Sequence, residues 1–414
     1  MKKLVALLLA LTLCIGLCAC GATAEKPAEE TPATTGETET PATDAKDIKV
    51  GFIFLHDENS TYDLNFINAA KAAAAELGLS DDKIMMKTNI AESQACYDAA
   101  AELVDAGCDL VITDSFGHES FALAAAKDFP EVQFVSCTGV KAHTEGLSNF
   151  HNAFASIYEG RYLAGVAAGL KLNEMIENGD ITAEEAKMGY VGAYPYAEVK
   201  SGYTSFFLGA RSICPSVTME VTFTSSWYDE ALEKEAANKL INNGCVLISQ
   251  HADYMGAPTA CETAGVPNVS YNGSTVAACP NTFIVSSRID WTPFFVYAIN
   301  CVASGEDIGY DWTGTLDTGS VVLTEVNEQA AAAGTVEKIA EVMKALEDGS
   351  VKVFDTATFT VNGETVTTYL ADVDDLGDYV GETEAISDGA FLESFYRSAP
   401  YFDLDIDGIT NLDA

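Results

Sequence analysis

The fold of this chain follows from one apolar run and the pattern after it: Val50-Gly51-Phe52-Ile53-Phe54-Leu55. The run is apolar throughout, which is typical of a strand that is covered on both faces of a parallel sheet. An Ala-rich helical segment, 65–77, follows it and ends at Gly78. A buried strand followed by a helix predicts the first half of a βαβ unit.

The same alternation continues along the chain and then starts again. The first series contains further strands at 84–88, 110–113 and 133–136 and helices at 93–106, 120–128 and 155–177. The second series contains strands at 187–191, 218–223, 246–249, 268–270 and 283–287 and helices at 200–212, 229–242, 258–264 and 292–304. The pattern predicts an α/β protein with two doubly wound parallel-sheet lobes joined by a hinge.

Two facing lobes predict a ligand site between them, because ligands bind outside the carboxyl ends of parallel strands. We expect an N-terminal lobe from 48–152 plus 283–311 and a C-terminal lobe from 153–282 plus 312–360, followed by an extension, 361–414. The chain is expected to cross between the lobes near 149–155, near 281–288 and after about 311. The extension has a turn signal, Asn362-Gly363, that predicts a β-hairpin.

The N-terminus predicts export and lipidation. Residues 1–20 begin with Lys2 and Lys3, continue as a short apolar run and close with Leu17-Cys18-Ala19-Cys20, as in a bacterial lipoprotein signal peptide. The run is too short for a comfortable membrane span. Cys20 is the residue expected to carry the lipid. Residues 21–47 are rich in Thr, Pro and Glu and predict a disordered tether outside the membrane.

Composition limits the partners of the folded part. A formal net charge of −40 argues against nucleic acid or an anionic membrane surface as its direct partner. Eight of the eleven cysteines lie beyond the signal region, none in a CxxC pair, and most sit in apolar surroundings. They are expected to be small buried hydrophobic residues rather than a disulfide framework. So many thiols in an exported chain suggest surroundings with little oxidant.

Several stretches resemble the basic membrane protein (BMP) family of substrate-binding lipoproteins. They are the opening strand with Ser60-Thr61-Tyr62-Asp63, and the segments 158–165, 189–193, 227–229, 244–253 and 290–295. The resemblance covers about residues 48–359. It implies a type I periplasmic-binding-protein-like fold, an ABC permease as partner and a small solute as ligand. The best understood members bind purine nucleosides, and a related branch binds nucleobases.

Aromatic residues after predicted strands are candidates for holding a planar ligand. Tyr62 follows the first strand and Trp227 follows the strand 218–223, so both are expected to stack on a ring, although Tyr62 would otherwise pack at the start of the next helix. Phe116 follows the strand 110–113 with Ser115, where a plain turn is the alternative. Trp291 would line the cleft or fix the hinge.

Polar residues at the same strand ends are candidates for hydrogen bonds to the ligand. Asp57, Asn59 and Asp63 would accept from a base edge or cap the next helix. His251 and Asp253 follow a buried strand, and Asp253 is expected to make a charge-assisted hydrogen bond. The alternative for these two residues is an ordinary exposed loop. Asn272 would contact the ligand or form a turn.

No catalytic motif is found, and no cofactor or metal is expected. The string Asp403-Leu404-Asp405-Ile406-Asp407-Gly408 matches half of a calcium loop, but position twelve is Ala414, so an acidic strand end is the better interpretation. The signal segment and the two lobes predict a lipid-anchored, extracytoplasmic solute receptor, and the resemblance to the BMP family implies an ABC importer and, as ligand, a purine nucleoside or nucleobase. A nucleoside- or sugar-processing hydrolase and a non-transporting sensor are the alternatives.

Overall fold

The computed structural model describes residues 43–374, 377 and 379–413. The predicted signal peptide, Cys20 and most of the predicted tether lie outside the described residues. Residues 45–47, expected in the tether, form a 3-10 turn, Ala45–Asp47, and the neighbouring Thr43 N donates to Ala303 O at 2.8 Å. The predicted tether, 21–47, therefore ends too far along the chain, because residues 43–47 already pack on the folded part.

The first lobe is built on a parallel sheet with the order β11-β5-β4-β3-β1-β2. Every neighbouring pair in it is parallel, and the central strands β1, β3, β4 and β5 are buried almost throughout. Its strands are β1 (Val50–Ile53), β2 (Ile84–Lys87), β3 (Leu110–Thr113), β4 (Gln133–Cys137), β5 (Phe150–Ala155) and β11 (Asp311–Gly314).

The second lobe is built on a sheet with the order β12-β10-β9-β8-β6-β7-β17. All its pairs are parallel except β10 with β12, which is antiparallel. Its strands are β6 (Lys187–Gly192), β7 (Thr218–Phe223), β8 (Leu247–His251), β9 (Asn268–Tyr271), β10 (Phe283–Ile289), β12 (Val321–Leu323) and β17 (Ile409–Asn411).

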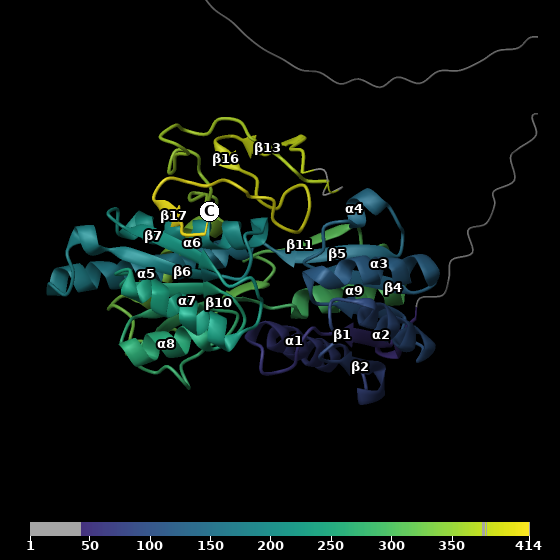
Figure 1. Cartoon of the computed structure of the whole chain (residues 1–414). Coiled ribbons are helices and arrows are strands. Elements are labelled where there is room, and N and C mark those ends of the chain that lie inside the picture. The colour runs from purple at the N-terminus through teal and green to yellow at the C-terminus, as the bar shows by residue number, and fades with distance from the viewer. Residues whose placement is uncertain (1–42, 375–376, 378, 414) are drawn as a thin grey trace, which may run out of the picture. The chain divides into compact units, whose positions relative to one another are not determined.

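Helices cover both sheets (Figure 1). Those of the first lobe are α1 (Thr61–Leu77), α2 (Gln94–Asp105), α3 (Glu119–Asp128), α4 (Ala142–Glu145) and α9 (Thr292–Ser304). Those of the second lobe are α5 (Ile157–Asn178), α6 (Ala197–Ile213), α7 (Glu230–Asn242), α8 (Gly256–Ala264) and α10 (Thr335–Glu347). No helix among the described residues is long and apolar enough to cross a membrane.

Glycines allow α5 and α6 to pack with their backbones close together. A Cβ atom at Gly165 would lie 2.0 Å from Phe206 O, and one at Gly209 would lie 2.1 Å from Tyr162 O. No side chain fits at such distances, so only glycine permits this approach. The segment resembling the BMP helix, 158–165, is thus part of α5 and packs against α6 in the second lobe.

The predicted α/β fold with two parallel-sheet lobes is confirmed. The sheets correct the predicted lobe boundaries. The strand β10 belongs to the second lobe, whereas the sequence predicts 283–311 in the first lobe. The strand β11 belongs to the first lobe, whereas the sequence predicts residues from 312 in the second lobe. The chain therefore crosses at Ser156, after Ile289 and between Gly314 and Val321.

Several elements were not expected from the sequence, and two of them change the layout of the lobes. The strand β5 occupies 150–155, where a crossing was predicted, and α10 lies between β12 and the extension. All eight cysteines of the described region are buried and unpaired, as predicted for small hydrophobic residues.

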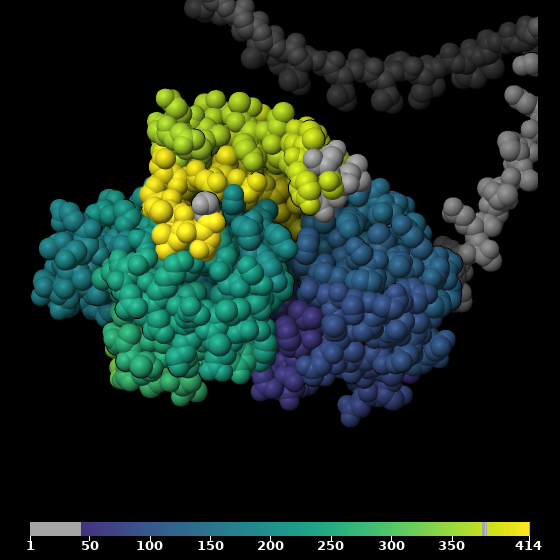
Figure 2. Space-filling model, viewed as in Figure 1, coloured from purple at the N-terminus to yellow at the C-terminus, as the bar shows by residue number. Residues whose placement is uncertain are grey.

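The C-terminal extension packs on the second lobe and reaches the first (Figure 2). Its strand β17 adds to the sheet edge beside β7, and Phe391 and Phe402 join the second-lobe core. Ser398 donates its backbone N–H and its hydroxyl to Asp311 Oδ1 of the first lobe, both at 2.8 Å.

Two sequence features of the extension differ in detail from expectation. The turn at Asn362-Gly363 closes a single bridge between Val361 and Glu364 instead of a full hairpin. In the calcium-like string, Asp403 and Asp405 form ion pairs with Lys200, at 2.8 and 3.0 Å. The string leads into β17, which agrees with the interpretation as an acidic strand end.

Candidate functional site

A narrow cavity lies between the carboxyl ends of the two sheets. The first lobe lines it with Leu55, His56, Tyr62, Ser115, Phe116 and Thr138, and the second with Glu198, Trp227, His251, Asp253 and Tyr271. The volume of this cavity is about 20 Å³, which is room for about one water molecule. A ring-sized solute therefore needs the walls to move apart before it can occupy this inner cavity.

Tyr62 is held in place by the end of a neighbouring strand. It is the second residue of α1, which Ser60 caps by accepting from Asp63 N at 3.2 Å. The Tyr62 hydroxyl donates to Asp114 O at 2.6 Å, and its ring lies 5.0 Å from that of Phe66. These two contacts hold the side chain of Tyr62 in place where it lines the inner cavity.

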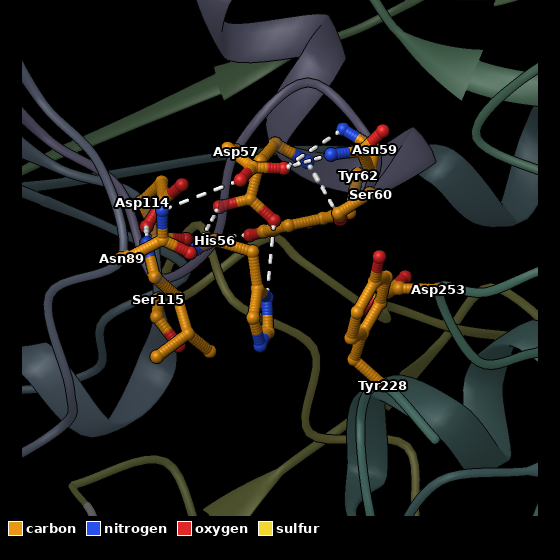
Figure 3. A network of polar contacts seen from close by, with 12 residues as sticks. His56, Asp57, Asn59, Ser60, Tyr62, Asn89, Asp114, Ser115, Tyr228 and Asp253 are labelled. Carbon is orange, nitrogen blue, oxygen red and sulfur yellow. Dashed lines mark hydrogen bonds and ion pairs between the residues drawn. The ribbon is translucent and has the colours of Figure 1, made fainter. Parts of the chain in front are cut away.

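Two carboxyl groups of the first lobe, Asp63 and Asp114, lie near this wall; His56, Tyr62 and Asp114 are labelled in Figure 3. Asp63 Oδ1 accepts from His56 N at 2.7 Å, and its Oδ2 lies 3.4 Å from His56 Nδ1. Burial alone would raise the pKa of Asp63, but hydrogen bonds, that from His56 foremost, lower it. Burial and the charge of Asp63 raise the pKa of Asp114 well above its usual value. Asp63 is therefore the charged member of the pair and Asp114 the neutral one.

The opposite wall carries a histidine between a carboxylate and a tyrosine. His251 ends β8, its Nε2 lies 3.4 Å from Glu198 Oε1, and its ring is 4.4 Å from that of Tyr271. Burial lowers the pKa of His251, so the ring is neutral near pH 7. A neutral imidazole can donate from one nitrogen and accept at the other.

Asp253 is buried beside the inner cavity and held by its neighbours. Its Oδ1 accepts from Asn272 Nδ2 at 3.0 Å, and its backbone N–H donates to Trp227 O at 2.9 Å. Burial raises the pKa of Asp253 well above its usual value, helped by the charges of Asp63, Glu233 and Glu198. Asp253 is thus a neutral carboxyl, able to donate as well as accept, and not the charged group that the sequence suggested.

A buried guanidinium lies under the second-lobe wall. Arg161 of α5 is fully buried and donates to Tyr190 Oη at 3.0 Å and to Ser249 Oγ at 2.8 Å. Its charge also lies 5.1 Å from the Tyr271 ring centroid. Arg161 therefore ties α5 to the strand ends that carry Tyr271 and His251.

The structure brings six of the predicted site residues to the inner cavity: Tyr62, Ser115, Phe116, Trp227, His251 and Asp253. Two more lie directly behind it, Asp63 against His56 and Asn272 against Asp253. Whether these residues bind a solute stays a prediction.

Three predicted site residues lie elsewhere. Asp57 Oδ1 accepts from Asn59 N and Nδ2, at 3.1 and 2.7 Å, so this exposed pair closes the turn before α1. Trp291 is buried in the first-lobe core, where its ring lies 4.5 Å from that of Phe66. Asp57 and Asn59 were expected to contact the ligand or to cap the next helix, but Ser60 is the cap of α1 and the pair forms the turn before it. Trp291 is a core residue.

Sequence reasoning missed several lining residues: Leu55, His56, Thr138, Glu198 and Tyr271. Most of them stand at or just after the end of a predicted strand, so the rule that placed Tyr62 and Ser115 would also have found His56, Thr138 and Tyr271. Glu198 lies in the first turn of α6, a position that strand patterns do not mark.

Contacts across the cleft hold the lobes together in this structure. Thr61 donates through N–H and hydroxyl to Asp253 O, each at 3.3 Å, and Asn65 Nδ2 donates to Asn272 O at 3.0 Å. The His56 ring stacks on Tyr228 of the second lobe (Figure 3). These contacts must separate when the inner cavity widens.

A larger space, which we call the outer chamber, adjoins the inner cavity. It measures about 800 Å³ and shares Phe116, Thr138 and Glu198 with the inner cavity. Its other walls come from both lobes and from the C-terminal extension, including Tyr369 and Tyr401. The extension thus covers one opening of the cleft.

One acidic cluster has the spacing of metal ligands among the described residues. Carboxylate oxygens of Asp372, Asp374 and Glu382 lie within 4.8 Å of one another in the extension. Glu382 Oε1 already accepts from the backbone N–H groups of residues 373 and 374. None of the three lines the inner cavity.

One family model matches residues 53–353, and it is described as "ABC transporter substrate-binding protein PnrA-like". The C-terminal extension, 361–414, lies beyond the matched region. The match covers both lobes, and therefore every residue that lines the inner cavity.

Two curated relatives carry names that mention a solute. The "Purine-binding protein BAB2_0673" of Brucella abortus is 30% identical over 62% of this chain and 69% of its own length. The "Putative ABC transporter glucose-binding protein TsgA13" of Haloferax volcanii is 31% identical over 52% of each chain.

Solved structures support the fold. A solute-binding protein of an ABC transporter system from Aeropyrum pernix matches with a TM-score of 0.61 at 18% identity, over 74% of this chain and 93% of that one. A similar protein from Conexibacter woesei matches with a TM-score of 0.59 at 19% identity, over 74% of this chain and 98% of that one. This chain belongs to the family of PnrA-like ABC transporter substrate-binding proteins.

Proposed function

We propose that this protein is a receptor for a purine nucleoside or nucleobase and that it delivers this solute to an ABC permease. Family membership establishes the broader function, a solute-binding component of an ABC transporter that works outside the cytoplasm. The family is one of substrate-binding proteins of transporters, which are not enzymes. What we propose beyond this broader function is that the solute is a purine.

The main support for a purine is that two aromatic side chains, one from each lobe, line the same small cavity. Tyr62 and Trp227 both line it, and neutral hydrogen-bonding groups, Asp253 and His251, lie beside them. Flat rings are held by stacking, while groups that both donate and accept suit the mixed edge of a purine base. The name of the Brucella relative supports the same choice.

A sugar is the second candidate. Aromatic rings beside carboxyl groups also suit the hydroxyls and apolar faces of a sugar, and the Haloferax relative is named as a glucose-binding protein. In this case Glu198 and Asp253 would bind hydroxyl groups. The two candidates differ in how much of the affinity depends on stacking.

Calorimetry and thermal shift with a defined panel separate the candidates. The panel contains adenine, guanine, hypoxanthine, adenosine, guanosine, inosine, ribose and glucose. The purine proposal requires micromolar or tighter binding of at least one base or nucleoside and no comparable binding of the sugars. Binding of glucose alone would replace the purine by the sugar, and conversion of a bound nucleoside to base and sugar during incubation would favour the hydrolase.

We also propose that Cys20 carries a lipid that holds the receptor at the outer face of the cell membrane. The support is the sequence before Cys20, which has the charge pattern and the length of a bacterial lipoprotein signal.

A further inference from the structure

Thr138 has an unusual backbone conformation for its residue type. It follows β4 with φ of 65°, in the left-handed region. A β-branched residue is a genuine outlier there, because its side chain crowds the backbone. Such conformations persist only where the surrounding structure imposes them, and they gather at ligand sites.

The backbone is held at Thr138 and just after it, beginning with the Thr138 N–H, which donates to Ala153 O at 2.8 Å. A buried carboxylate, Glu119, accepts from the backbone N–H groups of Val140 and Lys141 at 2.7 and 2.8 Å. Asn152 Oδ1 accepts from Ala142 N at 2.7 Å, and Asn152 Nδ2 donates to Glu119 Oε1 at 3.0 Å. These two side chains fix the backbone of the loop just after Thr138.

The hydroxyl of Thr138 is left without a partner. Thr138 is 4% exposed, and its Oγ1 has no hydrogen-bond partner among the described residues. A buried unsatisfied hydroxyl costs free energy, so its presence needs a reason. Thr138 lines both the inner cavity and the outer chamber, which share only two other lining residues.

We propose that Thr138 is a solute-binding residue whose hydroxyl forms a hydrogen bond with a polar group of the solute where the inner cavity meets the outer chamber. The solute group is a hydroxyl, amine or carbonyl, since a threonine hydroxyl both donates and accepts. The part of the solute beyond this group extends into the outer chamber. This inference rests on the proposed function and adds to it one contact and one direction of the bound solute.

Thr138→Val is the critical variant, because valine keeps the shape and the β-branch and removes only the hydroxyl. With the panel member that binds the wild-type protein best, we expect the dissociation constant to rise about fivefold to thirtyfold, the loss of one buried hydrogen bond. The midpoint of thermal unfolding without solute should stay equal or rise, because an unsatisfied hydroxyl has been removed. Thr138→Ser should keep the affinity within about threefold.

Thr204→Val is the matched control. Thr204 of α6 is also fully buried with a hydroxyl that lacks a partner among the described residues, but it lines neither the inner cavity nor the outer chamber. Its variant should behave like Thr138→Val in thermal unfolding and like the wild type in binding.

Two results would overturn the assignment. One is a Thr138→Val protein that binds the same solute within twofold of the wild type. The other is a Thr138→Val protein that unfolds several degrees below both the wild type and Thr204→Val, because the hydroxyl would then be structural. If the wild-type protein binds no member of the panel, the purine proposal has failed, and the assignment of Thr138 then depends on the unfolding comparison alone.

Discussion

His56 and Tyr228 lie face to face across the cleft, with ring centroids 4.5 Å apart and ring planes 27° from parallel. His56 follows β1 of the first lobe, and Tyr228 precedes α7 of the second. A contact between side chains of two lobes exists only while the lobes are closed. The pair therefore stabilises the closed form in which the inner cavity is enclosed.

Removing this pair should weaken solute binding through closure. We expect Tyr228→Leu and His56→Ala each to raise the dissociation constant, with a coupling of about 0.5–1.5 kcal/mol in the double-mutant cycle. Calorimetry of the three variants measures the coupling. Tyr254→Leu is the control, since Tyr254 contacts Tyr228 within the second lobe. Strictly additive effects of the two changes would show that the rings do not cooperate in closure.

Tyr62→Ala and Trp227→Ala should each lower the affinity for a purine about tenfold to hundredfold, because a stacked base is worth about 1–3 kcal/mol. Tyr62→Phe keeps the ring and removes only the hydrogen bond to Asp114 O, so its loss should be smaller. Trp291→Phe is the control from the first-lobe core and should lower thermal stability without changing affinity. Unchanged binding in both alanine variants would contradict stacking and the purine with it.

Asp253→Asn and Asp253→Ala should differ clearly in binding. A buried neutral carboxyl is well imitated by an amide, so Asp253→Asn should bind within about fivefold of the wild type. Asp253→Ala removes the donor and acceptor and leaves Asn272 Nδ2 without its partner, and we expect about a tenfold loss or more. If Asp253→Asn lost as much affinity as Asp253→Ala, the charged form of Asp253 would be the one that binds the solute.

Asp114→Asn should stabilise the protein at neutral pH. The raised pKa of Asp114 means that the folded state keeps its proton while the unfolded carboxyl ionises above about pH 4. Its contribution to stability is therefore complete below about pH 4 and lost as the pH rises towards the folded pKa. The variant should unfold roughly 2 °C or more above the wild type at pH 7, and this gain should shrink towards pH 4. The exposed Asp57, whose pKa is lowered by hydrogen bonds from Asn59, provides the control Asp57→Asn, which should show no such gain.

Cys20→Ser should release the protein from the membrane fraction of expressing cells without changing its thermal unfolding. The lipid attaches only to a cysteine thiol, and residue 20 lies outside the described fold. Fractionation after salt and carbonate washing measures the release. Cys18→Ser is the matched control and should stay in the membrane fraction, as should the wild type. A Cys20→Ser protein that remains bound would refute the lipid anchor.

The sequence by itself determined the class of the fold and the edge at which the site lies. Continuous apolar strands such as 50–55 can only be buried on both faces, and helices between them require parallel pairing, so the two lobes follow from local patterns. The rule that ligands bind at carboxyl strand ends then placed Tyr62, Ser115 and His251 correctly at the cavity. These properties depend on residues near one another in the chain.

Only the tertiary structure decided which strand belongs to which lobe and which of the candidates face the cleft. The strand β10 joins the second sheet because it pairs with Asn268–Tyr271 and with Val321–Leu323, the latter more than thirty residues later. Trp291 looks like a ligand residue in sequence, but packing against Phe66 places it in the core. The neutral state of Asp253 and the unsatisfied hydroxyl of Thr138 arise from burial, and burial is a sum over segments distant in the chain that no local pattern contains.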